Sequence, residues 1–168
     1  MPTLQYTSVM KKRLSQRAVL MLQASLRHFP ELRDKTITVG YTRAHLGSAI
    51  REQLIIRLRV RKLCYNTIGH ELTHLVQGAG GIPEGEKQCD IWTLARSPLF
   101  CDDAPTYLKL PSQLRTNWPQ YAILVRELCM QAIELRKIRR NYIQWLEREL
   151  SRLGKEQPQR MGQMSFAF

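Results

Sequence analysis

The sequence contains no apolar run long enough to cross a membrane. Its longest early run, residues 18–22, falls far short of the roughly 18 residues that a bilayer requires. Three basic residues at 11–13 precede this run, but polar residues between Gln23 and His28 interrupt its continuation, unlike the unbroken apolar core of a signal peptide. The pattern favours a soluble, cytoplasmic protein.

Cysteines are few and widely spaced. The chain has four, none of them in a CxxC pair: Cys64, Cys89, Cys101 and Cys129. This spacing argues against a disulfide framework and against a zinc knuckle built on paired thiolates. We therefore expect four free thiols, mostly buried, and the 168 residues suit one compact domain with an appendage.

Acidic residues are scarce in the first part of the chain. Residues 1–62 hold 13 Lys and Arg against 3 Asp and Glu, and residues 104–168 hold 11 against 5. Only residues 63–103 reverse this balance, with 2 against 6, inside a chain of net charge +12. Such a basic surface is typical of a nucleic-acid partner or of a plain solvated surface, and the sequence leaves both open.

Hydrophobic periodicity predicts an α+β fold. The expected helices span residues 10–29, 62–77, 83–96 and 117–153, and the expected strands span residues 36–42 and 54–60. Gly47 is expected in a turn, and the outward Arg57 and Arg59 indicate that the second strand forms an exposed sheet edge. We predict a domain over residues 1–116, a long helix over 117–153 packed on it, and a flexible tail over 154–168.

The stretch "GHELTH" places two histidines four residues apart in the third helix, with a glutamate beside the first. Residues at this spacing project from one face of a helix, so His70 and His74 can bind one tetrahedral ion. Glu71 then points into the same space without coordinating. A zinc ion lowers the pKa of its bound water to about 7, and a nearby carboxylate can accept the proton.

A zinc site of this kind needs a third protein ligand. The other histidines, His28 and His45, both lie upstream, so the patterns that use a downstream histidine do not apply. The remaining candidates are Glu84, Glu86, Cys89, Asp90, Cys101, Asp102 and Asp103. Glu86 and Asp90 are favoured because their spacing places both on one helix face, where one can bind the metal and the other can orient a histidine ring.

These motifs resemble the gluzincin group of zinc metallopeptidases. "GHELTHLVQ" followed by "EGEKQCD" matches the group's HExxH helix and its E-x-x-x-D helix, and the gap of eleven residues between His74 and Glu86 is similar to that of the minimal soluble gluzincins, the minigluzincins. The resemblance implies a zincin-like fold in which His70, His74 and Glu86 bind one zinc ion, Glu71 is the general base and Asp90 orients His70. It also implies that the strand carrying Ile55, Arg57 and Arg59 pairs with an extended peptide substrate.

The sequence leaves other assignments open. Tyr107 and His45 are candidate donors to a transition-state oxyanion. In the minimal gluzincins a C-terminal segment can block the cleft, so the expected endopeptidase could be latent. The tail "QMSFAF" resembles peptides that bacterial sliding clamps bind, which suggests a clamp as partner. The alternative function is a basic binding module or DNA-associated adaptor with a structural metal, closed by Cys89 or Cys101.

Overall fold

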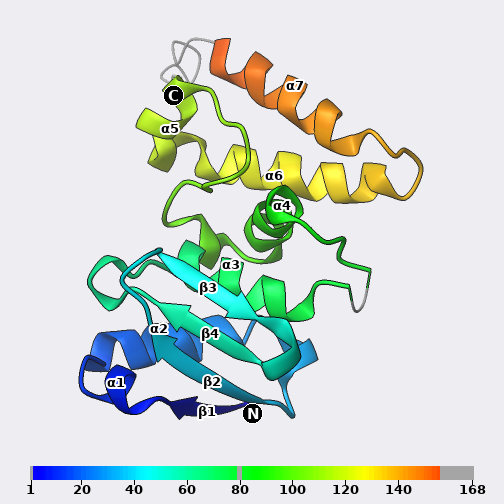
Figure 1. The fold of residues 1–168 in the computed structure, drawn as a ribbon. Helices are drawn as coiled ribbons and strands as arrows, with labels where there is room; N and C mark the ends of the chain where they lie inside the picture. The colour runs from blue at the N-terminus through cyan, green and yellow to red at the C-terminus, as the bar shows by residue number, and fades with distance from the viewer. Residues whose placement is uncertain (1, 79–80, 156–168) are drawn as a thin grey trace, which may run out of the picture.

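The structure, a computed structural model, describes residues 2–78 and 81–155. It is an α+β fold in which a small mixed sheet and its helices are followed by a mainly helical C-terminal half (Figure 1). The strands are β1 (Thr3–Tyr6), β2 (Thr36–Tyr41), β3 (Gly47–Ile50) and β4 (Ile55–Leu58). The helices are α1 (Ser8–Lys11), α2 (Gln16–Leu26), α3 (Tyr65–Val76), α4 (Glu86–Arg96), α5 (Ser112–Thr116), α6 (Trp118–Arg136) and α7 (Tyr142–Lys155).

The sheet has the strand order β1-β2-β4-β3, with β1, β2 and β4 parallel and β3 antiparallel to β4. Ile37 and Val39 of β2 and Ile56 and Leu58 of β4 are fully buried on one face. Helices α2 and α3 pack against this face and complete the first hydrophobic cluster. Strand alternation therefore anchors α3, which carries the two histidines, beneath the sheet.

The prediction that residues 54–60 form an edge strand is wrong. β4 pairs with β2 on one side and with β3 on the other, so its residues Ile55 and Arg57 lie in an inner strand and Arg59 lies just beyond it. The two edge strands are β1 and β3, and β3 begins at Gly47, where a turn was expected. The arginine side chains project from the open face of the sheet. Because side chains point perpendicular to the direction in which strands pair, they indicate an exposed face and not an unpaired edge.

The C-terminal part also differs from the prediction of one helix over residues 117–153. A long helix is present, but α6 ends at Arg136 and the chain reverses to form α7, which lies beside α6 (Figure 1). Both helices share the second hydrophobic cluster with α4 and with the segment from Cys101 to Leu114. The helix α4 and the C-terminal helices thus share a core, and α6 packs between α4 and α7.

Other boundaries shift by a few residues. The first expected helix is divided into α1 and α2, and α4 begins at Glu86, three residues after Pro83. Among the described residues, no helix combines the length and the apolar character needed to cross a bilayer. The tail predicted to be flexible and to resemble a clamp-binding peptide lies, apart from residues 154–155 in α7, outside the described residues.

Candidate metal centre

Helix α3 is fixed at both ends before any ligand is considered. At its N-terminus the carboxylate of Asp102 accepts hydrogen bonds from the backbone N–H groups of Tyr65 and Asn66, at 2.7 and 2.8 Å. Such a cap contributes about 1 kcal/mol and satisfies donors that the helix leaves free. At its C-terminus the guanidinium of Arg51 donates to the carbonyl oxygen of Gln77 at 2.9 Å.

The crossing of α3 and α4 depends on a glycine. A Cβ atom at Gly69 would approach atoms of Phe100 and Thr93 to between 2.6 and 2.9 Å, so a larger residue would force the segments apart. Next to this contact, Thr73 and Thr93 form a hydrogen bond at 2.8 Å. The close approach brings the first turn of α4 over the histidine face of α3.

Three acceptor atoms converge where the helices meet. Oε2 of Glu86 lies 3.0 Å from Nε2 of His70 and 3.1 Å from Nε2 of His74, and the two nitrogens are 3.1 Å apart. Ligands bound tetrahedrally at about 2.0–2.1 Å are about 3.3 Å from one another, so the observed spacing is close to that of a zinc shell. Glu86 is half-exposed, whereas both histidine side chains are largely covered.

The second nitrogen of His70 is held by a buried carboxylate. Its Nδ1 lies 2.8 Å from Oδ1 of Asp90. Oδ2 of Asp90 accepts hydrogen bonds from the backbone N–H groups of Tyr107 and Leu108, at 2.6 and 2.7 Å. Because two backbone donors occupy one oxygen of the carboxylate, the other oxygen accepts from the ring, and Nδ1 of His70 is the donor.

The second nitrogen of His74 is oriented by a neutral side chain. Its Nδ1 lies 2.7 Å from Oε1 of Gln77. The amide nitrogen of Gln77 donates to the carbonyl oxygens of Pro83 and Gly85, at 3.0 and 2.9 Å, which fixes the amide orientation. Oε1 is therefore an acceptor and Nδ1 of His74 a donor, so in its neutral form each histidine presents the lone pair of Nε2 to Glu86.

This arrangement requires a positive charge. Two imidazole lone pairs and a carboxylate oxygen face one another without a donor among them, so a cation or a proton must lie between them. Burial lowers the pKa of His70, but the hydrogen bond with the Asp90 carboxylate outweighs it, so the pKa is raised above its ordinary value.

Cys89 offers a different third donor. Its thiol and one nitrogen from each of His70 and His74 lie within 4.8 Å of one another, so this group could hold a metal ion. However, the thiol is fully buried and donates to the carbonyl oxygen of His70 at 3.1 Å. Burial raises the pKa of Cys89 to about 11, so it remains a thiol, whereas Glu86 is already beside both Nε2 atoms.

Glu71 lies next to this centre and is not one of the converging atoms. It is almost completely buried, and its Oε2 has no hydrogen-bond partner within the described part of the chain. Burial raises the pKa of Glu71 to about 7, with a further increase from Glu86 and an opposing effect from His70. A Cβ atom at Gly47 would lie 2.5 Å from Oε1 of Glu71, so the strand passes directly over this carboxylate.

A cleft of about 590 Å³ opens onto the site between β3 and the start of α4. Its walls include Gly47 to Ile50 on one side and Glu84 to Glu86 on the other, and all its lining residues lie between positions 45 and 107. Among the described residues, α6 and α7 therefore leave the cleft open. A smaller cavity of about 150 Å³ shares His45, Glu71 and Tyr107 with it.

The free edge of β3 faces this cleft. The backbone N–H of Arg59 donates to the carbonyl of Leu46, and pairing in an antiparallel ladder alternates from there. The unpaired backbone groups of β3 are consequently those of Gly47 and Ala49. They can form a two-residue ladder with an extended chain in the cleft.

The two candidate oxyanion donors both lie at the cleft. The ring of Tyr107 stacks on that of His70 at a centroid distance of 5.5 Å, and 48% of the residue is exposed. Burial, followed by the nearby Glu86, raises the pKa of Tyr107, so its hydroxyl keeps its proton. His45 lines both cavities.

The other predicted ligand candidates have different roles. Glu84 pairs with Arg51 at 2.7 Å, Asp102 caps α3, and Asp103 accepts a hydrogen bond from the backbone of Ala104. Cys101 lies in the second hydrophobic cluster. His28 packs its ring against Phe100, away from the cleft.

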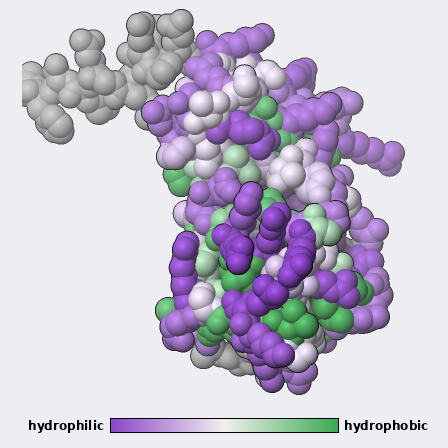
Figure 2. Space-filling model, turned by 60° about the vertical axis from the view of Figure 1, so that its left-hand side comes forward, coloured by the Kyte–Doolittle hydropathy of each residue, from purple (hydrophilic) through white to green (hydrophobic). Residues whose placement is uncertain are grey.

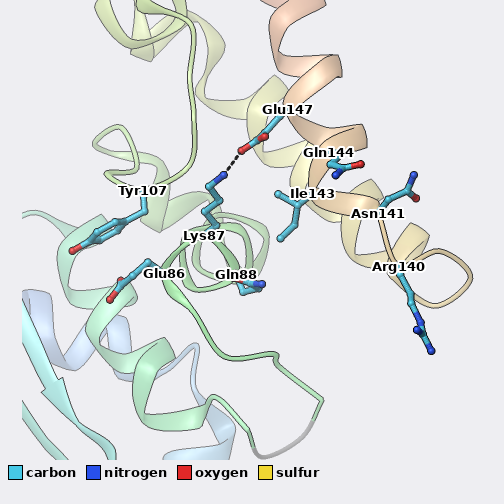
Figure 3. A pocket seen from close by; sticks show the side chains of 9 residues that line it. All are labelled: Glu86, Lys87, Gln88, Tyr107, Arg140, Asn141, Ile143, Gln144 and Glu147. Atoms are coloured by element: carbon cyan, nitrogen blue, oxygen red, sulfur yellow. Dashed lines mark hydrogen bonds and ion pairs between the residues drawn. The ribbon is translucent and has the colours of Figure 1, made fainter.

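A second hollow, of about 700 Å³, lies between the first turn of α4 and the start of α7. Figure 3 shows that Glu86 and Tyr107 point away from the α7 side chains, whereas Lys87 points towards them and forms an ion pair with Glu147 at 2.6 Å. Through this pair, α7 contacts the turn that carries Glu86.

Comparison of the chain with protein-family models, with curated proteins and with solved structures found no match.

Proposed function

We propose that this protein is a zinc-dependent endopeptidase of the gluzincin type. The observation that supports it most strongly is the convergence of His70, His74 and Glu86, with the buried carboxylate of Glu71 beside them. Two imidazole nitrogens and one carboxylate oxygen form a donor set that suits zinc and leaves a fourth position open, as catalytic zinc sites do.

The residues of the chain divide the chemistry between them. His70, His74 and Glu86 would hold the zinc ion, which would lower the pKa of water and polarise the scissile carbonyl. Glu71 accepts a proton from the water as its oxygen attacks the carbonyl carbon, and then delivers that proton to the departing amide nitrogen. A raised carboxylate pKa suits both steps, since the group must accept and return a proton near neutral pH.

The substrate is expected to be an extended peptide. The free backbone groups of Gly47 and Ala49 can pair with its main chain along β3, rather than along the strand of Ile55 and Arg57. Within the described part of the chain, no residue of α6 or α7 lines the cleft, which favours entry of a long chain and cleavage within it. Tyr107, whose ring stacks on that of His70, would donate a hydrogen bond to the oxyanion.

The alternative is a binding module with a structural metal held by His70, His74 and Cys89. Glu71 argues against it. Within the described residues, one oxygen of its buried carboxylate has no hydrogen-bond partner, which costs free energy, and a purely structural site gains nothing from it.

The replacement of Glu71 by Gln tests this proposal. Purified parent protein should contain about one zinc ion per chain, and the variant should keep that zinc while its cleavage of a peptide library falls by at least about a thousandfold. Metal content is measured by mass spectrometry, and cleavage by product sequencing. A Glu127→Gln variant, with the same change outside the site, is the matched control. Unchanged cleavage by the Glu71 variant would contradict the proposal.

A further inference from the structure

In the first 62 residues, the acidic side chains lie at one end of the parallel strands, and a group of basic side chains lies at the other. The three parallel strands β1, β2 and β4 have their carboxyl ends at the same end of the sheet, hereafter the basic end. Basic residues follow each of these strands closely: Lys11, Lys12 and Arg13 after β1, Arg43 after β2, and Arg59, Arg61 and Lys62 after β4.

The acidic residues of this segment lie at the opposite end. Glu31 and Asp34 precede β2, and Glu52 precedes β4, so all three are near the amino ends of strands. The separation follows from topology, because parallel strands bring the residues that follow them together even when they are far apart in sequence.

Contacts confirm that the three segments that follow β1, β2 and β4 are neighbours. The guanidinium of Arg13 lies 4.4 Å above the ring of Tyr41, the last residue of β2, and Arg59 donates its backbone N–H to Leu46, shortly after Arg43. Neighbouring strands are about 4.8 Å apart, so the three strand ends alone spread these cations over about 10 Å.

The seven cations lack local counter-charges. Within residues 2–78 and 81–155 none of them forms an ion pair with a carboxylate. The carboxylate of Asp102, which lies at the start of α3, is occupied by the backbone N–H groups of Tyr65 and Asn66. Apart from Arg59, which is half-buried, the seven residues are exposed.

Figure 2 turns this end of the sheet towards the viewer. Strongly hydrophilic side chains project over the lower part of the molecule, with hydrophobic patches between them. Two exposed apolar residues, Val9 of α1 and Leu46, belong to the same segments as the cations. Leu46 also lines the 150 Å³ cavity beside Glu71, but none of the seven cations lines that cavity or the 590 Å³ cleft, so the cations are separate from the proposed zinc site.

We infer that the basic end binds the phosphate backbone of a nucleic acid. Seven cations without an ion pair among the described residues, spread across the segments that follow three strands, fit the repeating charges of a phosphate backbone, which is recognised through distributed contacts. The net charge of +12 would add long-range attraction to any polyanion. Cations inside the substrate cleft would instead indicate an acidic polypeptide as the partner. None of these seven residues lies there.

A matched pair of triple variants tests the inference. One replaces Arg43, Arg61 and Lys62 of the basic end with Ala, and the other replaces Arg27, Arg33 and Lys35, which are also exposed but lie away from that end. Each removes three positive charges, so the net charge falls from +12 to +9 in both. Fluorescence anisotropy with a mixed-sequence DNA duplex of about 20 base pairs, over a range of salt concentrations, measures binding.

The basic-end variant should bind the duplex at least about tenfold more weakly, and its plot of log affinity against log salt should be shallower by about 2.7. The other variant should change by about twofold or less. Changing Arg43 and Arg61 to Lys should preserve binding, which separates loss of charge from loss of structure. Thermal unfolding checks that each variant is folded.

Three results would overturn the inference. The parent could fail to bind the duplex at about 0.1 M salt. The two triple variants could lose affinity equally, which would assign the effect to net charge. Finally, polyglutamate of matched charge could bind as tightly and lose as much affinity in the basic-end variant, which would identify an acidic polypeptide as the partner.

Discussion

The two helices that supply the proposed metal ligands hold them in different ways. Helix α3 is capped by Asp102 at one end and held by Arg51 at the other, and its ligands His70 and His74 are largely buried. Glu86 is the first residue of α4, follows Gly85 at a positive φ of 112°, and is half-exposed. The α3 half is preorganised, whereas Glu86 depends on the turn that precedes it.

Asp90 links the two helices, because it belongs to α4 but orients His70 of α3. We expect Asp90→Asn to weaken zinc affinity about a hundredfold, since it removes the charge that orients His70 and replaces an acceptor by a donor towards two backbone N–H groups. Competition with a chelator of known affinity measures this. Asp103→Asn makes the same change at an exposed carboxylate that accepts a hydrogen bond from the backbone of Ala104; it is the matched control and should bind zinc like the parent.

Gly47 tests the α3 half without touching a ligand. A methyl group there overlaps the carboxylate of Glu71, so Gly47→Ala should lower kcat about 30-fold while zinc content stays the same. Steady-state kinetics with a fluorogenic peptide, found from the library digestion, provides the measurement. Ser48→Ala changes the next residue of β3, which pairs with Arg57 on the open face. If both variants lost activity equally, the effect would belong to the strand and not to Glu71.

The smallest effect is expected from the ion pair that joins α4 to α7. Lys87 and Glu147 are both partly exposed, and such pairs contribute about 0.2–1 kcal/mol. A double-mutant cycle with Lys87→Ala and Glu147→Ala should give a coupling in that range and at most a few-fold change in zinc affinity. A loss of zinc in either single variant would mean that Glu86 depends on α7 far more than the geometry indicates.

The sequence predicts the local parts of the site. His70, Glu71 and His74 share one helix face, so their spacing alone places them together, and the same holds for Glu86 and Asp90 on α4. Gln77 was missed, although its position three residues after His74 puts it on the same face and could have revealed it. Glu86 and the two histidines lie on different helices. The sequence still predicts that they meet, because the short connection between α3 and α4 leaves few ways for the two helices to cross.

The sheet edge could not be predicted in the same way. The β3 sequence "GSAI" is short and has small side chains, so it shows no hydrophobic alternation. Arg57 and Arg59 indicate which face of β4 meets solvent, but they say nothing about which strands pair beside it. Similarly, no glycine or proline marks the reversal between α6 and α7, where Ile138 is 79% exposed.

The central claim is that Glu86, and not Cys89, completes a zinc site with the two histidines. X-ray absorption spectroscopy of the zinc-loaded protein tests it directly, because zinc–sulfur bonds of about 2.3 Å differ clearly from zinc–nitrogen and zinc–oxygen bonds of about 2.0–2.1 Å. We predict a shell of nitrogen and oxygen atoms only, with about one zinc ion per chain. A sulfur atom in the shell, or a protein that does not retain zinc, would contradict this account.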